Sequence, residues 1–81
     1  MAYKEHRLKI SPEYYEAWAN HKKKFELRKD DRGYEVGDYV WLCEWDGEHY
    51  TGRSTSLLQI KYILRNCPQY GLMDGYCILG F

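Results

Sequence analysis

The sequence lacks the features that mark small secreted, membrane-bound and zinc-stabilised proteins. Its three cysteines, Cys43, Cys67 and Cys77, are odd in number and show no Cys-x-x-Cys spacing, which argues against a disulfide scaffold and a zinc ribbon. The longest apolar run is far shorter than the roughly 20 residues that cross a bilayer. The first ten residues, MAYKEHRLKI, are charged where a signal peptide is apolar. These absences predict a reduced, soluble, cytoplasmic protein without a membrane partner.

Motifs for catalysis and metal binding are missing as well. His6, His21 and His49 share no metal-ligand spacing, and no Ser–His–Asp or Cys–His arrangement is indicated. The sequence contains no glycine-rich phosphate loop and no helix motif for a DNA groove. We therefore predict no metal and no cofactor, and we expect Cys43 and Cys77 to be buried, inert thiols.

The composition indicates one small domain with many half-polar aromatic side chains. A chain of 81 residues forms a single domain, residues 1–81, with a modest core. Nine tyrosines and three tryptophans supply large apolar area from few positions. Because Tyr and Trp also keep a polar edge, their excess is typical of half-buried surfaces and stacking sites as well as of core filling.

The formal net charge of zero hides a strong segregation of charge along the chain. Residues 22–32 hold six basic and three acidic side chains, residues 34–50 hold five acids and no Lys or Arg, and Arg53, Lys61 and Arg65 follow. A local positive field is therefore available to a ligand even though the total charge is nil.

A short strand followed by a helix is predicted near the start of the chain. His6–Ile10 (HRLKI) alternates polar and apolar residues and predicts a strand. Ser11 is a favourable N-cap and a proline suits the first helical position, which predicts a helix from Pro12 to about Asn20. Four residues at helical spacing are predicted to form its buried stripe: Tyr14, Ala17, Trp18 and His21.

The most charged stretch, Lys22–Gly33 (KKKFELRKDDRG), packs nine charged side chains into twelve positions. The alternation within Lys24–Lys29 predicts a strand whose apolar face, Phe25 and Leu27, lies on the core. The opposite face is charged and is expected to turn outward or into a cleft; it carries Lys24, Glu26 and Arg28.

The rest of the chain predicts strands joined mostly by turns. Tyr39–Trp45 is the strongest strand, Asp46-Gly47 signals a hairpin, and residues 57–64 favour strand. Residues 66–75 predict a loop, and Tyr76–Phe81 predicts a final buried strand. We expect an α+β fold, a small mixed β-barrel with one helix. The expected core residues are Trp18, Phe25, Leu27, Val40, Leu42, Ile60 and Ile78.

The run from His21 to Arg28 (HKKKFELR) resembles the G-x-K-x-x-E-x-R signature of ASCH domains, a branch of the PUA-like fold. Lys23, Glu26 and Arg28 match the signature, and His21 stands where that family usually has Gly. The segments SPEYYEAW, ELRKDDRGYEVGD, EWDGEHYTGR and GLMDGYCILGF are similar to a family of short uncharacterised ASCH-like proteins of bacteria and phages. The likeness covers nearly the whole chain.

The resemblance implies a PUA-like barrel and a ligand in a cleft beside it. ASCH domains are proposed to bind RNA there, with the signature lining the cleft. Some relatives are small amidohydrolases acting on acetylated cytidine, in which the signature Lys is thought to act covalently or as a base. Those enzymes carry Thr where this chain has Glu26, and a Glu from a later helix that finds no match in residues 57–72. The resemblance therefore favours a binding module over an enzyme.

Two functions follow, together with a structural alternative. The first is a noncatalytic RNA- or nucleotide-binding module, in which Lys23 and Arg28 supply positive charge and Glu26 orients Arg28 or accepts from a base edge. The second is an amidohydrolase on a modified nucleoside with Lys23 catalytic; since an ordinary Lys titrates near about 10.4, its pKa would have to be lowered. The structural alternative is a surface Arg–Glu pair worth about 0–1 kcal/mol.

A second predicted contact region is Tyr50–Arg53, where Gly52 permits close backbone approach and Arg53 follows at a strand end. We expect Arg53 on the rim of the same cleft as Lys23 and Arg28, with the acids of residues 35–48 on another face. Tyr34 or Tyr50 is a candidate for base stacking, or else packs in the core or at its rim. The expected partner is single-stranded RNA or a nucleotide. The predicted nucleic-acid-binding residues are Lys23, Glu26, Arg28, Lys29, Arg32, Tyr50 and Arg53.

Overall fold

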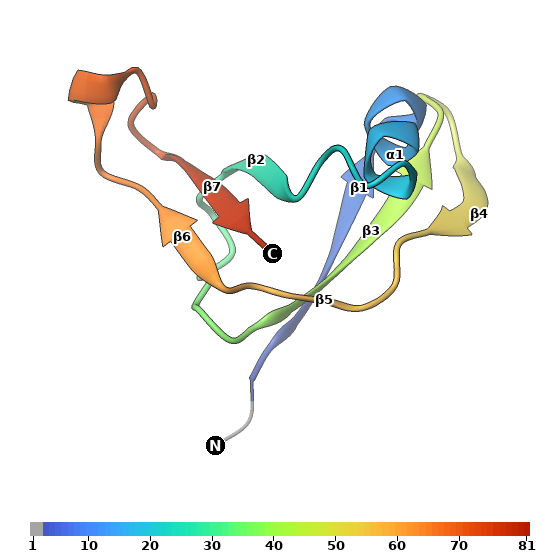
Figure 1. Ribbon diagram of the computed structural model, residues 1–81, viewed down its shortest axis with the longest axis horizontal. Helices are drawn as coiled ribbons and strands as arrows, with labels where there is room; N and C mark the ends of the chain where they lie inside the picture. Colours follow the sequence, from blue (N-terminus) through green and yellow to red (C-terminus); the bar gives the residue numbers. More distant parts are fainter. Residues whose placement is uncertain (1–2) are drawn as a thin grey trace.

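Two separately hydrogen-bonded sheets and one α-helix form the part of the chain that the structure, a computed structural model, describes: residues 3–81 (Figure 1). The elements, in chain order, are β1 (Glu5–Ile10), α1 (Pro12–Ala19), β2 (Phe25–Lys29), β3 (Tyr39–Trp45), β4 (Tyr50–Ser54), β5 (Leu58–Gln59), β6 (Tyr62–Leu64), the 3₁₀ helix η1 (Pro68–Tyr70) and β7 (Tyr76–Gly80). The predicted order of one helix after the first strand, then strands joined mostly by turns, is confirmed.

The first sheet is built around β3, the strand that the sequence marked most strongly. It pairs in parallel with β1, from Glu5 opposite Tyr39 to Ile10 opposite Glu44. On its other side it pairs antiparallel with β4 through the predicted hairpin, and with the two-residue strand β5. A strand with neighbours on both sides suits a sequence rich in β-branched and aromatic residues.

The second sheet has β7 in its centre, flanked antiparallel by β2 and β6. Figure 1 shows this sheet beside the first, with α1 near the carboxyl end of β1. Strands pair within each sheet and the described strands do not close into one barrel, so the predicted barrel is not confirmed. The coarser prediction, a mostly β fold with one helix, is confirmed.

The core lies between the inner faces of the two sheets. Burial alternates along β1, β3 and β7, as expected for strands with one face turned inward. The predicted core residues Val40, Leu42 and Ile60 are buried, whereas Trp18 and Ile78 are half-buried. The complete apolar cluster is Leu8, Ile10, Tyr34, Val40, Leu42, Ile60, Cys77 and Leu79.

The prediction that Phe25 and Leu27 lie on the core is wrong, whereas the charged face of β2 does turn into a cavity. Phe25 is 49% exposed and Leu27 is 55% exposed, whereas Glu26 is only 5% exposed. The cause is the register with β7, in which Glu26 lies opposite the buried Leu79 and Arg28 opposite the buried Cys77. Directly opposed residues of antiparallel strands share a face, so Glu26 and Arg28 must face inward.

The helix begins and ends close to where the sequence predicted. The Ser11 hydroxyl oxygen accepts a hydrogen bond from the Tyr14 backbone N–H at 3.4 Å, and Pro12 occupies the first turn. The predicted buried stripe is wrong for Tyr14 and His21, which are exposed. Tyr15 packs against the core instead, because the eight-residue helix meets the sheet with the adjacent side of its surface.

A buried carboxylate at the start of β3 ties together three segments of the chain. Asp38 is fully buried; it accepts hydrogen bonds from the backbone N–H of Lys4 and of Glu35, each at 3.1 Å. Its other contact is with His6, whose Nε2 lies 2.9 Å from Oδ2. Burial raises the pKa of Asp38, but the hydrogen bonds from His6 and from the two backbone groups outweigh it and hold that pKa below its ordinary value.

Two further findings bear on the predicted class of protein. Among residues 3–81, no helix has the length and apolarity needed to cross a bilayer. All three cysteines are free thiols, with Cys67 and Cys77 buried and Cys43 half-buried. Burial raises the pKa of the Cys77 thiol, which makes the reactive thiolate scarcer there.

Acid should weaken the fold through Asp38. The folded chain binds this proton less readily than the unfolded chain, so stability rises with pH in the range where the group titrates. Its contribution is complete above the ordinary pKa of 3.8 and is lost as pH falls through the lowered folded value. We expect Asp38→Asn to cost about 1–3 kcal/mol at pH 7 and much less at pH 2, measured by urea unfolding. Glu48→Gln, an exposed control, should change stability little at either pH; equal losses at both pH values for Asp38→Asn would contradict the prediction.

The thiols should differ in reactivity. With a disulfide-exchange reagent at neutral pH, we expect Cys43 to react first, and Cys67 and Cys77 only on unfolding, because attack requires an accessible thiolate. Reaction of all three thiols at one fast rate in the native protein would overturn this order.

Candidate functional site

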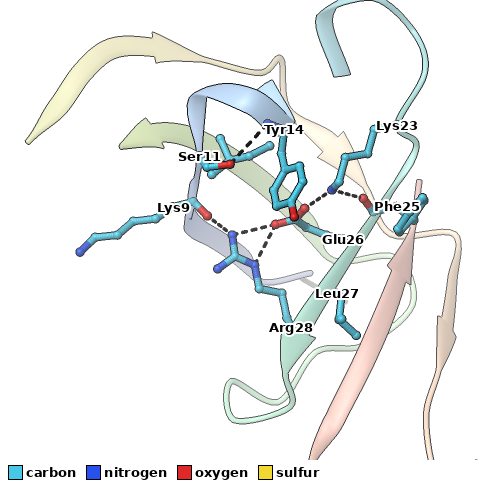
Figure 2. A pocket seen from close by; sticks show the side chains of 9 residues that line it. Lys9, Ser11, Tyr14, Lys23, Phe25, Glu26, Leu27 and Arg28 are labelled. Atoms are coloured by element: carbon cyan, nitrogen blue, oxygen red, sulfur yellow. Dashed lines mark hydrogen bonds and ion pairs between the residues drawn. The ribbon is translucent and has the colours of Figure 1, made fainter. Parts of the chain in front are cut away.

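A cavity of about 480 Å³ opens between the β1–α1 turn and β2 (Figure 2). Its lining includes the cations Lys23 and Arg28 and the acid Glu26, whereas the Lys9 side chain leads away from Glu26 and Arg28 (Figure 2). Its walls combine these charges with aromatic and aliphatic surface. The lining residues are Lys9, Ile10, Ser11, Tyr14, Lys23, Phe25, Glu26, Leu27 and Arg28.

Glu26 is the centre of the cavity's polar network. Its carboxylate contacts the Lys23 ammonium through Oε1, and it accepts from Arg28 Nε at 3.0 Å and Nη2 at 2.8 Å through Oε2. Figure 2 shows the two cations on either side of the carboxylate. One buried acid therefore holds both predicted basic residues in place, which is the orienting role that the sequence analysis considered for Glu26.

Lys23 is held on the short connection between α1 and β2. Its ammonium donates to the Phe25 carbonyl oxygen at 2.6 Å as well as to Glu26. The same ammonium lies 5.0 Å from the ring centroid of Phe25 and 5.5 Å from that of Tyr14. Both hydrogen-bond partners are acceptors, so Lys23 acts here as a donor within an aromatic wall.

Arg28 connects the two sheets across the cavity. Its Nη2 donates to the backbone carbonyl of Lys9, at the end of β1, while its other contacts go to Glu26 on β2. Within residues 3–81 these contacts use Nε and Nη2 and leave Nη1 without a hydrogen bond. The fork geometry of the guanidinium makes this possible, since it presents several donors in one plane.

A left-handed residue forms the turn between α1 and the cavity. His21 has φ 60°, in the left-handed region. Histidine is one of the few residues enriched there besides glycine, so it can form a tight turn at this position. Lys23 is therefore delivered to the cavity by a turn at the expected place.

The structure brings only some of the predicted binding residues together. Lys23, Glu26 and Arg28 line one cavity. Lys29 is exposed at the end of β2, and exposed Arg32 donates to the Arg7 carbonyl at 3.4 Å. The two remaining residues, Tyr50 and Arg53, line a different cavity of about 350 Å³ beside β4.

Arg53 is engaged in a separate ion-pair network. It donates to the Glu44 carboxylate at 3.0 and 2.8 Å and to Glu16 on α1 at 3.0 Å, and it lies over the Tyr15 ring. The hydrogen bonds from Arg53, followed by that from Thr51, hold the pKa of Glu44 below its ordinary value. Glu44 is one of the acids that we predicted on another face. Its pairing with Arg53 shows that this prediction is wrong for Glu44.

Six of the nine lining residues were not among the predicted site residues, and three of these six carry polar groups: Lys9, Ser11 and Tyr14. Ser11 was interpreted as a helix cap, Tyr14 as core, and Lys9 as the polar side of a strand. Each lies at the β1–α1 turn, and Arg28 reaches that turn only through tertiary structure. Nothing in their local pattern indicates proximity to the charged strand. The 52% exposure of Tyr14 is a property of the folded chain and cannot be read from the sequence.

Removing Glu26 should destabilise the protein as well as disturb the cavity. In Glu26→Ala the two cations lose their buried acceptor, and breaking a buried pair in this way costs about 3–5 kcal/mol. We expect a loss near the lower end, because the side chains of Lys23 and Arg28 are 13% and 23% exposed. Urea unfolding measures it, with Glu35→Ala, an exposed acid, as the control. Equal and small losses for both variants would show that the network contributes nothing.

Comparison with known proteins places the chain in a family. A curated relative, the "Uncharacterized 12.9 kDa protein in GpA 3'region" of Escherichia phage P2, is 42% identical over 53 residues. The match covers 65% of this chain and 49% of the phage protein, so the chain spans about half the length of that relative. Residues 5–81 match the family described as Domain of unknown function (DUF3850). These comparisons do not confirm the ASCH resemblance. Because the match extends over nearly the whole chain, the protein belongs to the DUF3850 family.

Proposed function

We propose that the protein is a small RNA- or nucleotide-binding module whose ligand enters the cavity between the β1–α1 turn and β2. The observation that carries the proposal is the pair of cations, Lys23 and Arg28, held at one cavity wall by the buried Glu26. Preorganised cations beside aromatic surface suit a ligand that combines a phosphate with a flat base.

The chemistry of the cavity assigns a part to each group. Arg28 presents Nη1 to a phosphate oxygen or a base edge, and Lys23 adds a point charge. The ring of Tyr14 offers apolar surface for a sugar or a base. A volume of about 480 Å³ lies within the roughly 300–1,000 Å³ of small-molecule pockets.

The proposal includes kinship with ASCH domains and the PUA-like fold. Support comes from the three signature residues, Lys23, Glu26 and Arg28, which meet in one cavity, and from the left-handed turn at His21. The proposed kinship would relate the two sheets described above to the closed barrel of the PUA-like fold.

The amidohydrolase alternative finds less support. A catalytic base or nucleophile needs a free lone pair on Lys23, whereas its ammonium donates to Glu26 and to the Phe25 carbonyl. Release of acetate from acetylated cytidine by the native protein, abolished in Lys23→Met, would favour the enzyme over the binder.

Binding should depend on the fork of Arg28. We expect adenosine monophosphate and short mixed RNA to shift the backbone resonances of Lys23 and Arg28 in NMR titrations at low salt. Arg28→Ala should weaken binding roughly ten- to hundredfold, as for the loss of a charged hydrogen bond. Arg28→Lys should recover only part of the affinity, because an ammonium restores the charge but cannot bond Glu26, the Lys9 carbonyl and a ligand from one planar group.

The matched control is Lys22→Ala, which removes an equal charge from the exposed neighbour of Lys23. It should change affinity less than about threefold at 0.1 M salt, since exposed charges are screened. The affinity for short RNA should fall with a log–log salt slope of about −1.5 to −2, from two or three phosphate contacts. Equal weakening by Lys22→Ala and Arg28→Ala, or no titration at all, would contradict the proposal.

A further inference from the structure

A further cavity, which we name the Trp45 cavity, adjoins the first around the β1–α1 turn and is distinct from the one beside β4. It has a volume of about 290 Å³ and extends from Pro12 to the end of β3 at Trp45, Asp46 and Gly47. Three residues line both cavities: Lys9, Ile10 and Ser11. The two cavities therefore adjoin along these residues, and Trp45 lies in the lining of the cavity next to the first.

Trp45 forms an aromatic platform in the lining of the Trp45 cavity. The indole packs edge-on against Tyr50, with ring centroids 4.9 Å apart and an interplanar angle of 74°. The hairpin register places the two residues opposite each other, and Tyr50 is 54% exposed. An edge-on neighbour fixes the orientation of the indole and leaves a face open to another group.

Lys9 occupies the indole face in the structure. Its ammonium lies 3.9 Å from the Trp45 ring centroid and 6.0 Å from that of Tyr50. Figure 2 shows its side chain leading away from Glu26 and Arg28, although its own carbonyl accepts from Arg28. A cation so placed marks an electron-rich, accessible face. Lys9 thus stands between Lys23 and Arg28 of the first cavity and Trp45 of the Trp45 cavity.

We propose that Trp45 is a base-stacking subsite, so that the ligand is single-stranded RNA of at least two nucleotides rather than a mononucleotide. This inference rests on the proposed function of the first cavity. One nucleotide occupies the cavity at Lys23 and Arg28, and the next base stacks on the indole in place of the Lys9 ammonium. Lys9 then pairs with the phosphate that joins the two nucleotides. Indole stacking accepts any base, because every base has a π-face.

Asp46, which lines the Trp45 cavity beside Trp45, supports this placement of the phosphate. Asp46 accepts from the backbone N–H of Glu48 and of His49, each at 2.9 Å, and it pairs with the His49 ring at 3.2 Å. The Glu48 and His49 N–H bonds hold the pKa of Asp46 below its ordinary value, so it stays negative near neutral pH. A phosphate is therefore favoured beside Lys9 and disfavoured beyond Trp45.

The test compares adenosine 5′-monophosphate with the 5′-phosphorylated dinucleotide pApA. For the native protein we expect the dinucleotide to bind about five- to hundredfold more tightly, the range for one stacked base, and to quench tryptophan fluorescence more strongly. In Trp45→Ala this gain should vanish while the affinity for the monophosphate is kept. Trp41→Phe is the control, because Trp41 lies on the same face of β3 with its indole N–H bonded to Glu5 at 2.6 Å.

A second variant keeps the test decisive if Trp45→Ala folds poorly. Lys9→Gln changes an exposed side chain; it should reduce the salt slope of pApA binding by about 0.7, the value of one phosphate contact, and weaken pApA binding more than binding of the monophosphate. Equal affinity for the two ligands, or a gain that persists in both variants, overturns the stacking subsite and spares the first cavity. Absence of binding by either ligand overturns the proposed function itself.

Discussion

The buried carboxylate of Glu26 is the interaction on which the candidate site depends. A carboxylate that is 5% exposed needs compensation, and it receives it from Lys23 on one side and from Arg28 on the other. Arg28 also reaches the Lys9 carbonyl, so this network connects β2 of the second sheet to the end of β1 in the first. Charge neutralisation and the joining of the sheets are therefore achieved by the same three residues.

The inward orientation of Glu26 has a consequence on the opposite face of the second sheet. Because alternate residues face opposite sides, Phe25 and Leu27 must point outward. They lie in rows with the neighbouring strands, Leu27 beside Ile78 and Leu64, and Phe25 beside Gly80 and Tyr62. The outer face is thus apolar. At this one strand, therefore, the charged side chains face inward and the apolar ones outward, against the usual pattern.

The segregation of charge along the chain is resolved in three dimensions by pairing. Two of the acids between residues 34 and 50 are buried: Asp38 is bonded to three residues, and Glu44 accepts from Arg53 and Thr51. The Arg53 guanidinium also reaches Glu16 and so joins β4 to α1. From the sequence alone we expected these acids to lie together on another face. Asp38 and Glu44 are instead buried and paired within the fold.

Local chemistry in the sequence determined much of the fold. The alternation of His6–Ile10, the Ser11-Pro12 helix start, the dense apolar strand Tyr39–Trp45 and the Asp46-Gly47 hairpin all formed where they were predicted, because capping, turn preference and periodicity act over a few residues. The signature residues Lys23, Glu26 and Arg28 were also found from sequence, through their resemblance to a known motif. Their spacing placed Glu26 and Arg28 on one face of a strand.

Tertiary structure decided which face that was, and which other residues join it. The hydrophobicity of Phe25 and Leu27 predicted the wrong orientation, because the register of β2 against the buried Cys77 and Leu79 of β7 overrides local preference. The addition of Lys9, Ser11 and Tyr14 to the cavity, and the loss of Arg53 to Glu44, depend on contacts between residues far apart in sequence. Local patterns carry no information on such pairings; they follow from how the two sheets pack.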